Sequence, residues 1–308
     1  MKYTITCMLV ALTTTLGCTE SNDDTAAEAV QARPDASVDA AVDIGADEGA
    51  PEEAPDMEPE PPEEIQGVKM LYMGHSFGRP FAEQLTDFTE AMGIEGHQQE
   101  IAFAGGANGP PQALWEHEGR RAQIQAILDG GDIEVLTMIC CSESFLESGE
   151  EWAVRSWMDY ALAQNPDTRF ALAMPWLDFP ESYPSVTEYY RVWSQLATVW
   201  LSLIDDLRAE YPGVEIFPIP HGGTAMVLRS RFENDALPEV DVLTSRETNA
   251  IFTDEKGHAN QILRDVGTLV WLGAVYDVDV SEYTFDPPYE TDLGAIAAEV
   301  LETNGIAE

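Results

Sequence analysis

The sequence predicts an α/β fold, a three-layer sandwich in which a five-stranded parallel sheet lies between two layers of helices. Two observations predict it. From residue 67 onward, short apolar runs alternate with longer amphipathic segments. The apolar runs are continuous, which is typical of strands that are buried on both faces of a parallel sheet. With 44% hydrophobic and 9% aromatic residues, the 308-residue chain can bury a core of that size.

The expected elements follow one another as strand and helix along a single domain, residues 67–308. Strands are expected at 68–73, 99–103, 133–140, 169–174 and 214–219, and helices at 80–92, 112–128, 151–164, 188–210 and 260–276. Apolar residues of the last helix recur at intervals of three and four, which places them on one helical face. In open parallel sheets, ligands bind beyond the carboxyl ends of the strands, so the loops at those ends are the first place to look for a site.

The first 18 residues are typical of an export signal. Lys2 precedes an apolar or small stretch at 5–16, and the segment ends in Thr-Leu-Gly-Cys at Cys18. It resembles a bacterial lipoprotein signal, in which the cysteine is acylated and becomes the mature N-terminus. The resemblance implies lipidation at Cys18 and, because Thr19 rather than Asp follows, sorting to the outer membrane, on its periplasmic or its cell-surface face. The alternative is an ordinary signal peptide with a chance cysteine.

Residues 19–66 are expected to be a disordered acidic tether. Positions 19–64 hold 16 acidic residues, one basic residue, six prolines and no aromatic, so little apolar surface offsets the entropy of ordering. The whole chain has a formal net charge of −41, and residues 67–308 alone, with 40 acidic and 13 basic residues, have −27. So negative a protein repels phosphate backbones, and we expect no nucleic-acid partner.

Cofactor and metal motifs are not found in the sequence. Besides Cys7 and Cys18, only Cys140 and Cys141 occur, and two cysteines cannot build a zinc site. We interpret this pair as two buried thiols at a strand end, with a strained vicinal disulfide as the alternative. The sequence has no glycine-rich phosphate-binding loop, dinucleotide fingerprint or calcium-binding loop, and we expect neither a cofactor nor a metal.

Two short motifs carry the chemistry. After the first expected strand the chain reads Gly74-His75-Ser76, which places Ser76 at the start of a helix, where free backbone N–H groups favour a developing oxyanion. Before the last helix stands the segment 253–260, TDEKGHAN, in which a carboxylate can hold one ring nitrogen of His258 while the other faces a nucleophile. Taken alone, Ser76 can equally be a helix cap and His258 a solvated turn residue.

Together these motifs resemble the SGNH/GDSL hydrolase family, whose secreted bacterial members carry a Gly-His-Ser or Gly-Asn-Ser opening block and an Asp-x-x-His block before the last helix. The resemblance covers about residues 68–276 in order and spacing. It implies an SGNH-hydrolase-like (flavodoxin-like) fold, with Ser76 as nucleophile and His258 as general base. The family's acid stands three residues before the histidine. That position is Glu255 here, which spacing favours, and Asp254 is the alternative.

The resemblance also implies an oxyanion hole formed by the N–H of Ser76 and a glycine N–H from the loop after the second strand. Gly106 is favoured there, with Gly105 nearly equal. The family's third block places an asparagine after the third strand, whereas residues 140–144 read CCSES. Losing one oxyanion donor costs about 2.7–4 kcal/mol of transition-state stabilisation, and Asn108 or Ser142 are the candidate substitutes.

Several further residues lie at the same edge of the expected sheet. His75 and His221 are candidate substrate contacts, and the alternative is that each orders its own loop. An aromatic cluster follows the fourth strand, and its members either stack on sugar rings or pack the loop onto the domain. They are Trp176, Phe179, Tyr183, Tyr189, Tyr190 and Trp193.

The sequence therefore leaves two hypotheses. The favoured one is an envelope-anchored serine hydrolase acting on carboxylic esters, including acetyl esters of polysaccharides, with the ester substrate and the membrane (through its lipid anchor) as partners. The alternative, motivated by the absent asparagine, is a catalytically inactive SGNH-like lipoprotein that binds or scaffolds.

Overall fold

A computed structural model of the chain describes residues 64–139 and 151–306. These residues belong to one compact unit, Glu60–Glu308. Cys18, most of the expected tether, and Cys140, Cys141 and Ser142 lie outside the described residues. The expectations that rest on them therefore stay predictions.

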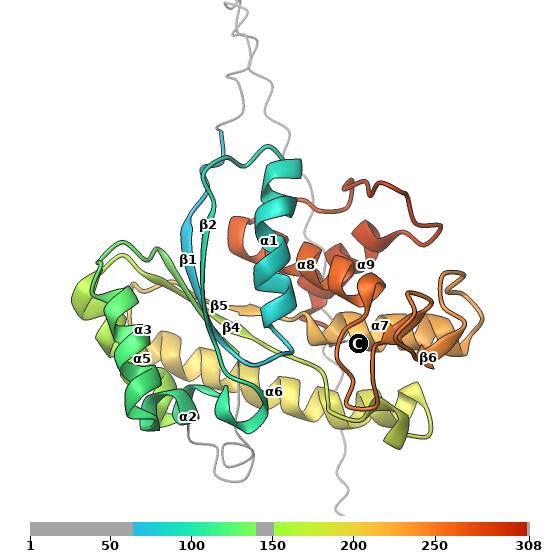
Figure 1. Ribbon diagram of the computed structural model, residues 1–308, viewed down its shortest axis with the longest axis horizontal. Coiled ribbons are helices and arrows are strands. Elements are labelled where there is room, and N and C mark those ends of the chain that lie inside the picture. The colour runs from blue at the N-terminus through green and yellow to red at the C-terminus, as the bar shows by residue number, and fades with distance from the viewer. Residues whose placement is uncertain (1–63, 140–150, 307–308) are drawn as a thin grey trace, which may run out of the picture. The chain divides into compact units, whose positions relative to one another are not determined.

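Five parallel strands form the central sheet in the order β2-β1-β3-β4-β5, which confirms the predicted flavodoxin-like α/β class (Figure 1). They are β1 (Lys69–Gly74), β2 (Gln98–Phe103), β3 (Val135–Ile139), β4 (Arg169–Ala173) and β5 (Ile216–Ile219). Every residue of β3 is buried, and in register Tyr72 of β1 lies between Ile101 of β2 and Thr137 of β3. The order places β1 between β2 and β3, so the loop that follows β1 lies at the carboxyl edge next to the loops that follow those two strands.

Helices cover both faces of this sheet (Figure 1). One face carries α1 (Arg79–Ala91) and α8 (Gln261–Tyr276), which pack on each other, together with α7 (Gly222–Glu233) and α9 (Leu293–Thr303). The other face carries α2 (Pro111–Glu116), α3 (Glu118–Leu128), α5 (Trp152–Gln164) and α6 (Val186–Glu210). The predicted three-layer sandwich is therefore confirmed.

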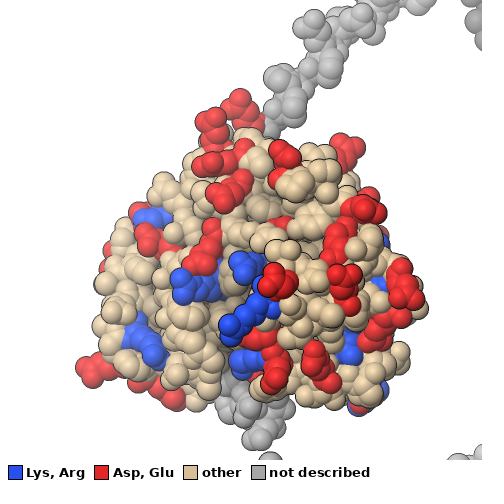
Figure 2. Space-filling view, turned by 45° about the vertical axis from the view of Figure 1, so that its right-hand side comes forward, with Lys and Arg blue, Asp and Glu red and all other residues tan. Residues whose placement is uncertain are grey.

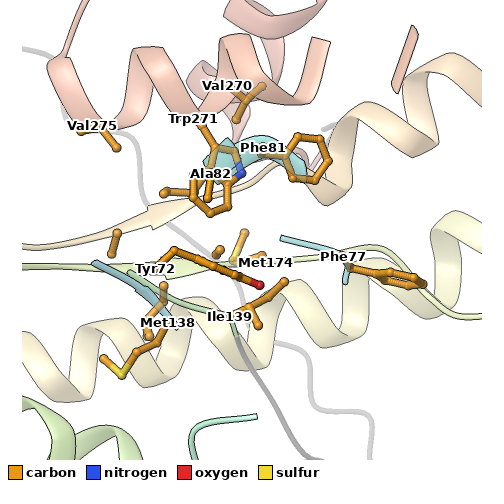
Figure 3. Packing of buried hydrophobic residues seen from close by; sticks show 14 of the residues in the cluster. Tyr72, Phe77, Phe81, Ala82, Met138, Ile139, Met174, Val270, Trp271 and Val275 are labelled. Carbon is orange, nitrogen blue, oxygen red and sulfur yellow. The ribbon is translucent and has the colours of Figure 1, made fainter. Parts of the chain in front are cut away.

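Large side chains fill the space between the sheet and the α1–α8 layer (Figure 3). Tyr72 of β1, Phe81 of α1 and Trp271 of α8 are all fully buried. The ring of Trp271 meets the Tyr72 ring edge-on at 5.8 Å and stacks on the Phe81 ring at 6.0 Å between centroids. Burying three such aromatics in one contact cluster fixes α1, and with it the turn that precedes α1, against the sheet.

The structure differs from the sequence expectation in several elements. The helix expected over 112–128 is two helices, because His117 has an extended backbone (ψ 101°) and its Nδ1 accepts the N–H of Arg120 at 3.3 Å as a cap for α3. Helices α7 and α9 were not expected, nor was the separate parallel pair β6 (Val242–Thr244) and β7 (Ala250–Phe252). Helix α7 is buried along most of its first two turns, so its sequence shows no apolar stripe.

Acidic side chains are scattered widely over the face of the molecule shown in Figure 2, where Lys and Arg are fewer. Within residues 64–139 and 151–306, no helix combines the length and the apolar character that crossing a membrane requires.

Candidate active site

Ser76 lies in a tight turn between β1 and α1. The carbonyl oxygen of His75 accepts the N–H groups of Gly78 and Arg79, each at 3.2 Å, and the hydroxyl of Tyr72 at 2.5 Å. Glycine is required on both sides of the turn: a Cβ on Gly74 would lie 2.3 Å from Cγ2 of Ile139, and one on Gly78 would lie 2.7 Å from the Tyr72 hydroxyl. The turn therefore seats its backbone against the sheet and leaves Ser76 partly exposed.

The imidazole of His258 joins Ser76 to a carboxylate. Ser76 Oγ lies 2.9 Å from His258 Nε2, and His258 Nδ1 lies 2.7 Å from Asp254 Oδ2. The other oxygen of Asp254 accepts the backbone N–H groups of Gly257 (3.1 Å) and His258 (3.2 Å). An alcohol near the start of the domain and an imidazole near its end, 182 positions apart, thus meet at hydrogen-bonding distance.

Electrostatics favour the charged form of Asp254. Partial burial acts to raise the pKa of this carboxyl, but the hydrogen bonds from the His258 ring and from the N–H groups of His258 and Gly257 outweigh it, so the pKa is lowered. An ionised Asp254 that accepts from Nδ1–H keeps the proton on that nitrogen. His258 Nε2 is then free to accept a proton from Ser76.

The preference for Glu255 over Asp254 was wrong. The side chain of Glu255 is exposed and has no hydrogen-bond or ion-pair partner among the described residues. The reason is the turn: Gly257, at φ +96°, donates its N–H to the Asp254 carbonyl oxygen at 2.9 Å and folds the chain back. This reversal brings the residue four positions before His258, rather than three, under the imidazole ring.

The expected oxyanion loop lies beside the serine turn. Gly109 packs so closely on His75 that a Cβ there would lie 2.6 Å from the His75 Cβ. The N–H of Ser76 has no acceptor among residues 64–139 and 151–306, as an oxyanion donor requires. Gly105 and Gly106 are exposed, with Gly106 at φ +55° at the start of a 3₁₀ turn, Gly106–Asn108.

None of the loop candidates is hydrogen-bonded to Ser76. The side chain of Asn108 is directed within its own loop, where its Nδ2 donates to the Gly105 carbonyl oxygen at 3.4 Å. The roles of Gly105, Gly106 and Asn108 as oxyanion donors remain predictions. Sequence reasoning missed Gly109, whose close approach to His75 fixes the loop. Its only sequence signal is a third glycine in the run 105–109.

His221 is not available to a substrate. Its side chain is fully buried, with Nε2 3.1 Å from the Phe77 carbonyl oxygen and Nδ1 3.3 Å from the Ile219 carbonyl oxygen. Burial lowers its pKa to about 4. The expectation of a substrate contact is therefore corrected: His221 ties the start of α7 to the serine turn.

His75 remains a candidate contact. Its ring is partly exposed, and its Nδ1 accepts the N–H of Phe77 at 3.3 Å. Burial lowers the pKa of His75 to about 4; Asp178 counteracts this shift, and the neighbouring Lys256 and His258 add to it. At neutral pH the ring is thus uncharged and carries its proton on Nε2, which makes that nitrogen a hydrogen-bond donor.

The loop after β4 braces the histidine turn. Trp176 donates its indole N–H to the Gly257 carbonyl oxygen at 2.8 Å and stacks on Phe77 at 5.0 Å between ring centroids. Phe77 in turn meets the His258 ring edge-on at 5.4 Å. Figure 1 shows this yellow-green segment between β4 and α6 reaching the orange loop before α8. Trp176 therefore packs one loop onto another. For this residue, the interpretation that the aromatic cluster packs the loop onto the domain agrees with the structure.

The arrangement can perform acyl transfer, since a serine, a base and an orienting carboxylate stand in hydrogen-bond sequence. No group of three or more His, Cys, Asp or Glu within the described ranges is placed to hold a metal ion. The segment that replaces the family's third block, residues 140–144, lies outside the described residues.

No protein-family model and no curated protein matches the sequence. Among solved structures, the chain resembles a DUF4886 family protein from Bacteroides uniformis ATCC 8492, with a TM-score of 0.54 and 14% identity over 79% of this chain and 97% of that one. It also resembles a protein from Slackia heliotrinireducens, provisionally assigned as an SGNH hydrolase, with a TM-score of 0.45 and 12% identity over 68% of this chain and 99% of that one. A family 3 carbohydrate esterase from Clostridium thermocellum gives a TM-score of 0.41 and 13% identity over 68% of this chain and 96% of that one. The Bacteroides protein shares the fold.

Proposed function

We propose that this protein is a serine hydrolase of the SGNH type that cleaves carboxylic esters. One observation carries the proposal: two consecutive hydrogen bonds, of 2.9 and 2.7 Å, link Ser76 to His258 and His258 to Asp254. A buried core could bring one such pair together by chance. Three groups in the order that nucleophilic catalysis requires, at the carboxyl edge of a parallel sheet, are a far more specific arrangement.

In this mechanism Ser76 Oγ attacks the ester carbonyl carbon while His258 Nε2 accepts the hydroxyl proton. The tetrahedral oxyanion accepts hydrogen bonds from the N–H groups of Ser76 and Gly106. Its collapse breaks the bond to the alcohol, which leaves with the proton from His258, and Ser76 holds the acyl group. Water then attacks the acyl carbon and gives a proton to His258. When the second tetrahedral intermediate collapses, the bond to Ser76 Oγ breaks, His258 returns the proton to Oγ, and the carboxylic acid leaves. Asp254 stabilises the imidazolium in both steps.

Within this function, we propose that the ester substrate carries a small acyl group, such as acetyl, on a hydroxyl of a polysaccharide.

We further propose that Cys18 is acylated and anchors the protein to the outer membrane, with residues 19–66 as a spacer. An acidic, proline-rich spacer keeps the domain away from an anionic surface because like charges repel. Mass spectrometry of the purified N-terminal peptide tests the anchor: an unmodified Cys18, or cleavage elsewhere, contradicts it.

The hydrolase is tested by incubating the full chain with p-nitrophenyl acetate, acetylated xylan and acetylated peptidoglycan. We expect turnover that Ser76→Ala lowers by roughly 10⁶-fold in kcat, the loss that follows removal of the nucleophile from such a triad. Turnover that is the same in Ser76→Ala and in the unchanged chain contradicts the mechanism.

The second candidate is a binding or scaffolding protein on the same fold, and the absence of an asparagine in CCSES at 140–144 favours it. A fluorophosphonate probe separates the two candidates, because it labels only an activated serine. Labelling that disappears in both Ser76→Ala and His258→Ala supports the enzyme, whereas no labelling under conditions that label an active esterase supports the binding protein.

A further inference from the structure

Phe179 has an unusual backbone and an unusual exposure for an aromatic residue. Its φ of 56° and ψ of 60° lie in the left-handed region, which costs about 1–2 kcal/mol for a residue with a Cβ. The side chain is nevertheless 51% exposed, so burial of the ring does not offset that cost. Strain of this kind persists where the surroundings hold it, and it concentrates at ligand sites.

The surroundings hold the Phe179 backbone from two sides. Its N–H donates to the Lys256 carbonyl oxygen at 2.9 Å, which ties it to the histidine turn. Beneath it, the buried guanidinium of Arg229 donates to the carbonyl oxygens of Pro180 at 2.6 Å and Tyr183 at 2.7 Å. The exposed ring is therefore presented by a fixed backbone rather than by a loose loop.

The Phe179 ring is the outermost of a row of neighbouring side chains that begins at the candidate catalytic base, formed by His258, Phe77, Lys256 and Phe179. The His258 ring meets Phe77, and the ammonium group of Lys256 lies 5.9 Å from the centroid of the Phe77 ring and 5.7 Å from that of the Phe179 ring. Lys256 thus lies between two aromatic rings, the outer of which is exposed. A molecule that extends from Ser76 along this row of side chains contacts Lys256 and then Phe179.

The polar groups beside the ring narrow the ligand class. Lys256 Nζ and Asp178 Oδ2 form an ion pair at 2.5 Å, with 38% and 45% of their side chains exposed, so both still have open hydrogen-bonding positions. A plain acyl chain would leave the open hydrogen-bonding positions of this ion pair unused, and an anion would meet the carboxylate of Asp178 on a strongly acidic protein. A sugar ring matches both features: its C–H face stacks on an aromatic ring, and its hydroxyls donate to a carboxylate and accept from an ammonium.

We propose that Phe179, with Asp178 and Lys256, forms a subsite that binds a neutral pyranose ring. On the proposed function, this ring belongs to the alcohol portion of the ester, and Phe179 determines specificity. The subsite itself does not depend on catalysis, so it can be measured by binding alone.

The binding experiment uses the full chain with xylotetraose and N-acetylated chitotetraose, both uncharged and free of ester groups, and titration calorimetry measures binding. Phe179→Gly removes the ring and suits the left-handed backbone, so the variant should fold with an unfolding temperature no lower than that of the unchanged chain. We expect it to weaken the Kd for the oligosaccharide that binds by about tenfold, the upper range for one aromatic stacking contact. Phe179→Tyr should retain binding, and Val242→Ala, which trims an exposed apolar side chain in β6, should leave it unchanged.

The kinetic experiment separates specificity from positioning. For an acetylated xylotetraose, Phe179→Gly should raise KM with little change in kcat, while turnover of ethyl acetate stays within roughly twofold. Equal losses on both esters would show that Phe179 only positions the histidine turn, and unchanged binding and KM would show that the ring contacts no sugar; either result overturns the subsite. If the chain binds neither oligosaccharide, the subsite is also wrong, even where Ser76-dependent turnover of ethyl acetate upholds the hydrolase. Oligosaccharide binding that needs Phe179, without any turnover, upholds the subsite and removes the hydrolase.

Discussion

Replacing Asp254 by Asn tests how the carboxylate orients His258. Asp254 Oδ1 accepts two backbone N–H groups and Oδ2 accepts from the imidazole at 2.7 Å. In Asp254→Asn the amide oxygen can keep the two backbone bonds, which leaves the amide NH₂ facing His258 Nδ1. A donor at that place forces Nδ1 to accept and moves the ring proton to Nε2. The imidazole then cannot take the proton of Ser76.

The wrong tautomer should lower kcat by roughly 10⁴-fold, which corresponds to about 5.5 kcal/mol of activation free energy. Initial rates with p-nitrophenyl acetate measure it, and circular dichroism shows whether the fold is kept. Glu255→Gln is the matched control: the same change one residue along should alter kcat less than about twofold, because the Glu255 side chain is exposed. A large loss in Glu255→Gln, or activity of Asp254→Asn within about tenfold of the unchanged chain, would refute the assignment of Asp254.

Three further predictions concern the surroundings of the site. Gly74→Ala should lower the free energy of unfolding by about 1–3 kcal/mol, because its Cβ would lie 2.3 Å from Ile139 Cγ2. Gly105→Ala is the control, since its Cβ would meet only Phe103 Cζ, at 4.0 Å. Urea unfolding of both variants measures the difference. The pKa of buried His221 is lowered to about 4, so the unfolded chain takes up a proton that the native state excludes. The stability this confers is present above pH ~6.5 and is lost as the pH falls toward 4, by at most about 3 kcal/mol. Urea midpoints at neutral and acidic pH should therefore decline less in His221→Gln, and an unchanged slope would contradict this. Arg229→Met should destabilise the fold by roughly 3 kcal/mol, since it removes the buried cation that holds the 180–183 segment; a loss below about 1 kcal/mol in calorimetry would show that other contacts hold it.

The strands and most helices could be predicted because their burial produces a hydrophobic pattern in the local sequence. The run 135–139, VLTMI, is apolar at every position except Thr137, since both its faces are covered, and α8 shows apolar residues at intervals of three and four. Helix α7 could not be found in this way. Its first residues, Gly222 and Gly223, read as a turn, yet in the fold they allow the helix to approach the Pro175 carbonyl oxygen and Gly305, where Cβ atoms would lie 2.6 Å from their neighbours.

In the candidate site, too, one part could be predicted from local sequence and another could not. The Gly-His-Ser block identified Ser76 because the turn that presents it is local: Gly74 and Gly78 are needed wherever a strand passes so tightly into a helix beside Tyr72. The choice between Asp254 and Glu255 was not local in that sense. Spacing gave the wrong residue, because the left-handed backbone of Gly257 and the close packing of Pro180 on that glycine decide which carboxylate faces the ring.

The order of the elements and the chemical groups at the carboxyl edge of the sheet follow from local sequence, because hydrophobic period and turn glycines act over a few residues. Which of these groups meet depends on the packed fold. The contact of Ser76 with His258, the burial of His221 and the exposed ring of Phe179 all depend on packing between segments far apart in the chain, which no local pattern encodes.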